Sequence, residues 1–105
     1  MLLDECVPRP LKREFPRHDV TTVVEMGWGS KRNSELLALM LTGDFNAFVT
    51  VDQNLEFQQN IRASGIAVVV IQARSNRLKE LRPLAPAVAE ALARIKAGEL
   101  IRVAA

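Results

Sequence analysis

The sequence contains very little cysteine and histidine, since Cys6 and His18 are the only residues of their kinds. A single cysteine cannot form an intramolecular disulfide, so nothing indicates an oxidising compartment and the cytoplasm is favoured. His18 has no serine or cysteine partner in a recognisable motif, which argues against a nucleophilic hydrolase built around it. A glycine-rich phosphate-binding loop of the usual pattern is also absent.

Long hydrophobic runs are missing as well. No apolar stretch approaches the roughly 20 residues of a membrane span, and the beginning lacks the basic region of a secretory signal. Internal repeats, low-complexity segments and linkers are absent. With 105 residues, of which 49% are hydrophobic and 25% charged, the sequence predicts a single domain over residues 1–105 with no membrane partner.

Charge is nearly balanced overall but unevenly distributed. The net charge is +2, so the molecule is not a polycation. Between residues 62 and 82 the basic side chains outnumber a single acid, Glu80; they are Arg62, Arg74, Arg77, Lys79 and Arg82. This run is either a solvated face or, if it borders an acidic metal site, a track for phosphates.

Apolar and β-branched runs alternate with helical patterns along the chain. Strands are expected at residues 1–3, 20–24, 47–51 and 66–71, with an edge strand at 100–103. Helices are expected at residues 9–15, from Asn33 or Ser34 to Gly43, at 53–63 and at 84–97, with a short turn at 77–81. The alternation predicts an α/β fold, a three-layer α/β/α sandwich with a mainly parallel sheet in the order 2-1-3-4 plus the edge strand.

Three smaller expectations accompany this fold. The helix that begins near residue 33 is expected to bury Leu36, Leu37, Met40 and Leu41. Gly43 is expected to end it as a left-handed cap. Trp28 stands between two glycines, and we expect its ring to fold onto the core, although a base-stacking role remains open.

Acidic residues follow two strands that the predicted order makes neighbours. The first strand runs into Asp4 and Glu5, and the third ends in Thr50 and Asp52. Parallel sheets bind their ligands at the carboxyl ends of the strands, and Glu35 lies in the first turn of a helix. Because crowded carboxylates repel one another and a hard cation such as Mg²⁺ relieves the repulsion, Asp4, Glu35 and Asp52 form a candidate metal site.

Each of these acids also has an ordinary structural explanation. Asp52 could cap the helix that follows it, as aspartate commonly does. Glu35 could be a first-turn acid that favours the helix dipole. Asp4 and Glu5 could be surface residues of a loop between strand and helix. The residue pattern alone leaves these alternatives open.

Three segments of the chain resemble the PIN-like nuclease superfamily. They are Leu-Leu-Asp-Glu-Cys-Val-Pro at residues 2–8, Asn-Ser-Glu-Leu-Leu at residues 33–37, and Phe-Val-Thr-Val-Asp-Gln-Asn-Leu at residues 48–55. The chain is most similar to the small toxin-type group related to VapC toxins, and the resemblance extends from Leu2 to about Pro86. The Thr-x-Asp element is its most specific part.

The resemblance implies a metal-dependent endoribonuclease that uses Mg²⁺ or Mn²⁺. Carried over by position, Asp4 and Asp52 would be metal ligands, and Glu35 a ligand or water-orienting acid. Glu5, Thr50, Asn33 and Asn54 would be supporting residues. If the protein is such a nuclease, the basic run at residues 62–82 is expected to supply the RNA-binding residues, namely Arg62, Arg74 and Arg77. The implied partners are an RNA substrate and a small DNA-binding antitoxin, and the resemblance leaves a homodimer open.

The chain departs from the family pattern at three positions. Cys6 stands where asparagine is expected, Asn33 where an acid is common, and Asn54 where a second aspartate often follows Asp52. Fewer negative charges imply weaker cation binding. A catalytically degenerate PIN-like module that binds protein or RNA therefore stays open. A flavodoxin-like receiver is a third interpretation, because acids at strand ends also suit phospho-acceptance. The absence of a lysine after residues 66–71, where such a receiver needs one, counts against it.

Overall fold

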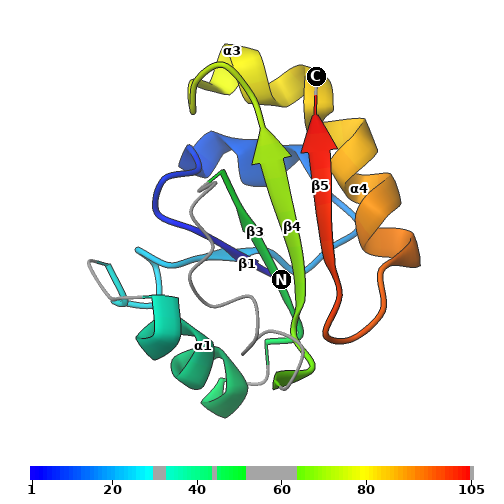
Figure 1. Ribbon diagram of the computed structural model, residues 1–105. Coiled ribbons are helices and arrows are strands. Elements are labelled where there is room, and N and C mark those ends of the chain that lie inside the picture. The colour runs from blue at the N-terminus through cyan, green and yellow to red at the C-terminus, as the bar shows by residue number, and fades with distance from the viewer. Residues whose placement is uncertain (30–32, 44, 52–63, 105) are drawn as a thin grey trace.

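The computed structural model describes residues 1–29, 33–43, 45–51 and 64–104, and the side chains of residues 33 and 34 lie outside the description. Within this part of the chain the structure is an α/β fold around a five-stranded parallel sheet (Figure 1). The strands are β1 (Leu2–Leu3), β2 (Thr21–Thr22), β3 (Ala47–Thr50), β4 (Ala67–Gln72) and β5 (Leu100–Ala104).

The strand order is β2-β1-β3-β4-β5, so the predicted order is confirmed and the last strand lies at the edge. Leu2 pairs with Thr21 on one side and with Phe48 on the other. The first and third strands are therefore neighbours. The direction in which successive strands are added reverses between β1 and β3. Ligands bind at such switch points in open α/β sheets.

Short helical segments connect the strands. They are the 3₁₀-helices η1 (Arg9–Glu14) and η2 (Arg82–Leu84) and the α-helices α1 (Asn33–Thr42), α3 (Leu78–Leu81) and α4 (Ala85–Arg94). Pro83 and Pro86 occupy first-turn positions of η2 and α4, where the missing N–H group removes no helical hydrogen bond. The final helix is shorter than the predicted 84–97, and the predicted helix at 53–63 lies outside the described residues.

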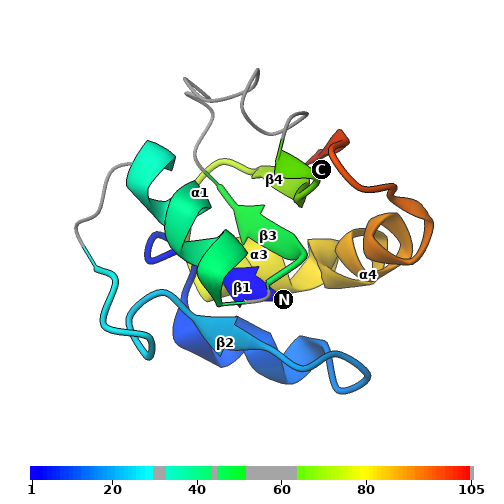
Figure 2. The same cartoon turned by 90° about the horizontal axis from the view of Figure 1, so that it is seen from below.

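Two apolar clusters cover the two faces of the sheet. Leu2 and Phe48 point to the face covered by α1, whereas Leu3 and Val49 point to the face covered by η1, α3 and α4. Figure 2, seen along the strands, shows α1 on one side and α4 on the other. Residues 67–71 of β4 are all buried, as expected for a strand covered on both faces. Within the described residues no helix is long and apolar enough to cross a membrane.

The second strand is shorter than the prediction of residues 20–24. After Thr22 the chain turns, because the amide of Glu25 donates to Thr22 Oγ1 at 3.0 Å and the amide of Thr22 donates to Glu25 Oε1 at 3.3 Å. Such reciprocal side-chain bonds compete with the sheet for backbone groups. Val24 is consequently 67% exposed, and its β-branched side chain does not extend the strand.

The predicted left-handed cap at Gly43 is wrong. Among the described glycines, positive φ angles occur at Gly27, Gly65 and Gly98, not at Gly43. A Cβ atom at Gly43 would stand 3.2 Å from the ring of Phe45 and 3.3 Å from that of Trp28. A side chain there would crowd these two rings, so the absence of a Cβ atom leaves room for them. The two rings meet edge to face with centroids 5.8 Å apart, and Trp28 packs on the core as expected.

The buried side of α1 is also narrower than predicted. Leu36, Leu37 and Met40 are buried, but Leu41 is 50% exposed. At about 100° per residue Leu41 lies at the rim of the arc that the other three define. Its inclusion in the buried set was wrong.

Candidate functional site

The candidate site begins with Asp4 at the carboxyl end of β1. The Asp4 amide donates to the carbonyl of Val49 at 2.9 Å, which continues the pairing of β1 with β3 by one residue. Because Leu3 pairs with Val49, Asp4 comes level with Thr50 on the neighbouring strand. Asp4 is 7% exposed and Thr50 is 1% exposed, so the two side chains meet away from bulk solvent.

Among the described residues, three donate hydrogen bonds to the carboxylate of Asp4. The Thr50 hydroxyl donates to Oδ2 at 2.7 Å, and the Cys6 thiol donates to the same oxygen at 3.4 Å. The amide of Glu5 donates to Oδ1 at 2.8 Å. Hydrogen bonds to a charged acceptor are stronger than neutral ones, so these donors fix the orientation of a buried anion. The predicted supporting role of Thr50 has this contact as its physical basis.

Cys6 completes a small triangle with Asp4 and Thr50, since its sulfur lies 3.6 Å from Thr50 Oγ1. Burial raises the pKa of the Cys6 thiol; hydrogen bonds from the Val51 backbone and from Thr50 oppose this shift, and the charge of Asp4 adds to it. The thiol therefore keeps its proton at neutral pH and remains a donor to Asp4. Cysteine here supplies a donor at the position where the family resemblance expects an asparagine.

The loop at residues 73–77 lies directly against this turn. The side-chain amide of Asn76 donates to the carbonyl of Cys6 at 3.1 Å. Arg74 and Arg77, on either side of Asn76, are exposed. Two of the three predicted RNA-binding arginines are thus on a loop that contacts the Asp4 turn, and the third, Arg62, is outside the described residues.

The other predicted acids are less closely gathered. Glu35 is exposed in the first turn of α1. Glu5 is exposed next to Asp4, and its Oε2 would stand 3.4 Å from a Cβ atom added at Gly29. In the described part of the chain no three His, Cys, Asp or Glu side chains could jointly hold a metal ion. Asp52 and Asn54 lie outside the described residues, as does the side chain of Asn33.

A hard divalent cation fits the donor set at Asp4. Mg²⁺ commonly takes only one or two protein carboxylates and keeps several waters. Of the hydrogen bonds from the described residues, two reach Oδ2 and one reaches Oδ1, so Oδ1 retains a lone pair for a further partner. The Cys6 sulfur is a soft donor that Mg²⁺ does not select, and it contributes by orienting the carboxylate instead.

Sequence reasoning missed Asn76 and treated Cys6 only as a departure from the family pattern. Asn76 bonds to a residue far away in sequence, and no periodic pattern indicates such a contact. The only signal in the sequence was its place, in a polar loop directly after the buried strand at residues 66–71. Loops that follow parallel strands line the carboxyl edge of a sheet, so this position could have been grouped with Asp4.

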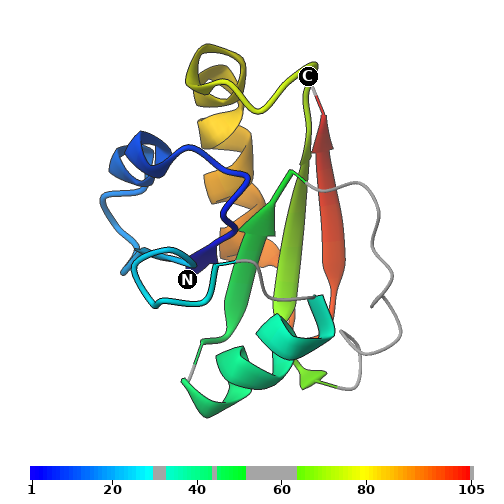
Figure 3. The same ribbon diagram turned by 90° about the vertical axis from the view of Figure 1, so that its left-hand side faces the viewer.

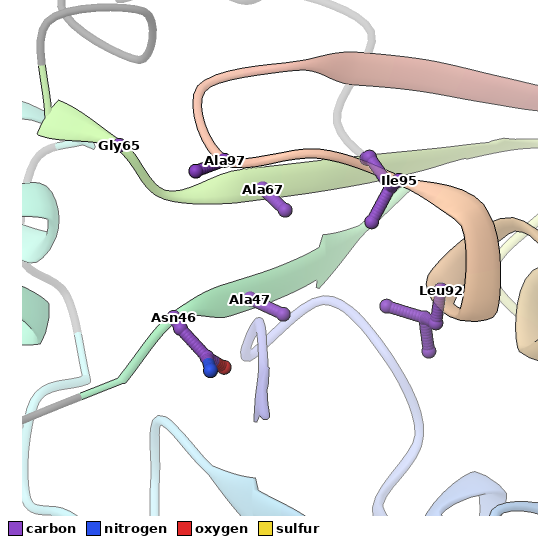
Figure 4. A pocket seen from close by; sticks show the side chains of 7 residues that line it. All are labelled: Asn46, Ala47, Gly65, Ala67, Leu92, Ile95 and Ala97. Carbon is purple, nitrogen blue, oxygen red and sulfur yellow. The ribbon is translucent and has the colours of Figure 1, made fainter.

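A separate hollow of about 210 Å³ lies at the opposite, amino-terminal edge of the sheet (Figure 4). Its walls come from the beginnings of β3 and β4 and from the end of α4 with the residues that follow. The lining residues are Asn46, Ala47, Gly65, Ala67, Leu92, Ile95 and Ala97. None of these side chains is ionisable, so the hollow offers no acid or base for catalysis.

Comparison with known proteins gives no assignment, because no family model, no curated protein and no solved structure matches the chain.

Proposed function

We propose that the chain is a divalent-metal-dependent endoribonuclease of PIN-like type and the toxin component of a toxin–antitoxin pair. The observation that carries this proposal is the buried carboxylate of Asp4, held by the Thr50 hydroxyl at the carboxyl edge where β1 and β3 adjoin. Such edges are where α/β sheets bind ligands. The resemblance of residues 2–8, 33–37 and 48–55 to PIN-like nucleases supplies the reaction class.

In this mechanism Asp4 would hold the cation, and Thr50 and Cys6 orient its carboxylate through their bonds to Oδ2. Asp52 and Glu35 complete the acid set, as the resemblance implies. Mg²⁺ or Mn²⁺, when bound, supplies charge that polarises a phosphodiester and lowers the pKa of water. Arg74 and Arg77 lie on the loop that Asn76 attaches to the Asp4 turn, and they neutralise phosphates beside the reacting bond.

The proposal includes a cytoplasmic location and a small DNA-binding antitoxin as partner. The single cysteine supports a reducing compartment, because the chain cannot form an intramolecular disulfide. The antitoxin follows from the toxin-type group that the sequence resembles. A homodimer is compatible with both expectations.

The test is cleavage of single-stranded RNA by purified protein in Mg²⁺ or Mn²⁺, compared with the variants Asp4→Asn and Asp52→Asn. Each substitution keeps the side-chain shape but removes an anionic ligand, so we expect cleavage to fall by at least about 100-fold. The asparagine that replaces Asp4 still offers an oxygen to Thr50, but its NH2 group then faces the Glu5 amide, which is also a donor. The free energy of unfolding should therefore fall by about 1–3 kcal/mol, and thermal unfolding checks that the variant is folded.

Two controls decide the result. Asp19→Asn makes the same change at an exposed aspartate before β2 and should leave cleavage intact. A chelator should abolish cleavage by the wild type. Cleavage that survives both the chelator and the two active-site variants would come from a contaminating nuclease, and the proposal would then be without support.

A catalytically degenerate PIN-like module is the second candidate, and the contacts of Asp4 favour it. Three protein donors already satisfy much of the carboxylate, so the turn is held together without a cation. The module would bind RNA or protein through the same surface and would not turn over. Folded wild-type protein that cleaves no RNA in either metal, yet still binds RNA or the antitoxin, would establish this alternative.

A further inference from the structure

Exposed basic side chains gather on the two segments nearest the Asp4 turn, η1 and the stretch from residue 74 to α3. We name this surface the η1–α3 basic face and define it by Arg9, Arg13, Arg74, Arg77 and Lys79, all exposed. The sequence run at residues 62–82 indicated part of it. The contribution of η1 was not visible from sequence, because Arg9 and Arg13 are far from that run.

Tertiary packing makes these two segments one surface. Helix α3 packs against η1, and the Arg82 side chain after α3 reaches Glu14 at the end of η1 at 4.0 Å. Figure 3 shows η1, in blue, and α3, in yellow, on the same side of the sheet toward the arrowheads of the strands. The bond from Asn76 to Cys6 then joins this surface to the Asp4 turn.

The charges of the η1–α3 basic face are free to bind a ligand. Two neighbouring cations are occupied, since Lys12 pairs with Glu25 at 3.1 Å and Arg82 with Glu14. In the described structure, the five residues of the face form no ion pair of this kind. The acids on the same segments are Glu14 and Glu80, and Glu14 is the partner of Arg82. The face therefore keeps a net positive charge.

We infer that the backbone of single-stranded RNA extends from the Asp4 site across the η1–α3 basic face, with its phosphates on Arg77, Arg9 and Arg13. This inference rests on the proposed function for its substrate. Phe15, the aromatic residue next to η1, is buried, and none of the five residues that define the face carries an aromatic ring for base stacking. Recognition is consequently electrostatic, with little base preference and a steep dependence on salt.

The experiment measures binding of labelled single-stranded RNA to the full chain by fluorescence anisotropy over a series of salt concentrations, in chelator so that no cleavage occurs. The double variant Arg9→Gln/Arg13→Gln removes two charges from the face. The matched control, Arg94→Gln/Lys96→Gln, removes two exposed charges near the amino-terminal edge of the sheet. Thermal unfolding of both variants checks that each is folded.

The slope of log K against log salt should become shallower by about 0.7 for each phosphate of a single strand that the protein no longer neutralises. We expect a change of about 1.4 for the face variant, together with weaker binding at low salt, and no change in slope for the control. Equal changes in both variants would mean that net charge alone attracts RNA, and the inference would be overturned. It would also be overturned if the face variant bound RNA normally and failed only to bind an acidic protein partner.

Failure of this inference is distinguishable from failure of the proposed nuclease function. If the wild-type protein does not cleave RNA but the face variant shows reduced salt-dependent binding, the RNA-binding surface is supported and the nuclease function is rejected. If the protein cleaves RNA in a metal-dependent way but the face variant has an unchanged salt slope, the nuclease function is supported and this path for the RNA is rejected.

Discussion

The carboxyl edge and the amino edge of the sheet differ in the side chains that form them. At the carboxyl edge, Asp4 and Thr50 are buried polar side chains that bond to each other, and the basic loop at residues 73–77 lies beside them. At the amino edge, Ala47 and Ala67 help to line a hollow of about 210 Å³ without any ionisable side chain (Figure 4). The same strands contribute to both edges.

The difference shows where this small domain concentrates its polar interactions. A buried carboxylate is costly unless hydrogen bonds compensate for the missing hydration, and Asp4 receives donors from Glu5, Cys6 and Thr50. The amino edge uses small apolar residues, which need no such compensation. A structural change at the first edge should therefore cost more than one at the second, and three measurements test that expectation.

The largest effect is expected from Thr50→Val, which keeps the side-chain shape and removes the hydroxyl that donates to Asp4 at 2.7 Å. Removal of a donor to a buried charged acceptor should lower the free energy of unfolding by about 1–3 kcal/mol. If the nuclease proposal holds, a weakened orienting bond should also reduce metal affinity by about 10–100-fold. Denaturant unfolding and metal titration provide the two measurements.

Thr50→Ser is the matched control, because serine retains the hydroxyl and lacks only a methyl group. It should recover most of the metal affinity that Thr50→Val loses. If serine and valine reduce metal affinity equally, the hydroxyl does not position Asp4. The claim that polar hydrogen bonds distinguish the carboxyl edge from the amino edge would then be wrong.

A smaller effect is expected from the ionisation of Cys6. Burial raises the pKa of its thiol above the ordinary value of 9.0, so the folded protein holds this proton more tightly than the unfolded chain does. The resulting stabilisation is fully present below the pKa of the unfolded chain and is lost as the pH rises through the higher pKa of the folded state.

The free energy of unfolding of the wild type should therefore fall more steeply than that of Cys6→Ala as the pH rises above 9.0. Denaturant titrations of both proteins across this range give the two curves. Parallel curves would show that the folded and unfolded thiols titrate alike, contrary to the enclosed position of Cys6 beside Asp4.

The smallest effect is expected at the amino edge. Ala47→Val adds two methyl groups at the hollow and places a β-branched residue in a strand. We expect the free energy of unfolding to rise by no more than about 1 kcal/mol, because the hollow only partly encloses the added carbons. RNA binding and cleavage should not change. A decrease in the free energy of unfolding of more than about 2 kcal/mol would indicate that the hollow cannot adjust to the added methyl groups. The amino edge would then tolerate substitution as poorly as the carboxyl edge.

The sheet could be predicted from sequence because its central strands are strongly apolar. The run at residues 66–71 is aliphatic, and strands covered on both faces have this composition. The order followed from alternating strands and helices and from the requirement that Asp4 and Asp52 share a site. Confirmed adjacency of β1 and β3 supports the first argument, whereas the position of Asp52 remains a prediction.

The errors in the fold came from interactions between side chains and backbone. Val24 has high β-propensity, but the bonds between Thr22 and Glu25 turn the chain after Val23, whose amide still donates to the carbonyl of Leu3 at 2.9 Å. Gly43 was interpreted by its backbone freedom, whereas the structure uses its lack of a side chain beside Phe45 and Trp28. Local propensity does not contain either kind of information.

The acidic residue of the candidate site, Asp4, could be predicted from the sequence, but most of the residues around it could not. Asp4 was expected because it ends a strand, and Thr50 because of the resemblance. The bond from Asn76 to Cys6 and the packing of α3 on η1 are products of tertiary structure. No pattern within either segment indicates its distant partner, so the extent of the η1–α3 basic face became visible only in three dimensions.

The pairing of β1 also has a consequence for the growing polypeptide during translation. Asp4 is synthesised 46 residues before Thr50, the last residue of the strand that flanks it on the inner side of the sheet. At synthesis rates of about 5–20 residues per second, Asp4 waits roughly 2–10 s for that partner. Leu2 and Leu3 remain without their central neighbour for the same interval. A polypeptide interrupted before Thr50 would carry the acid but could not assemble the pocket around it.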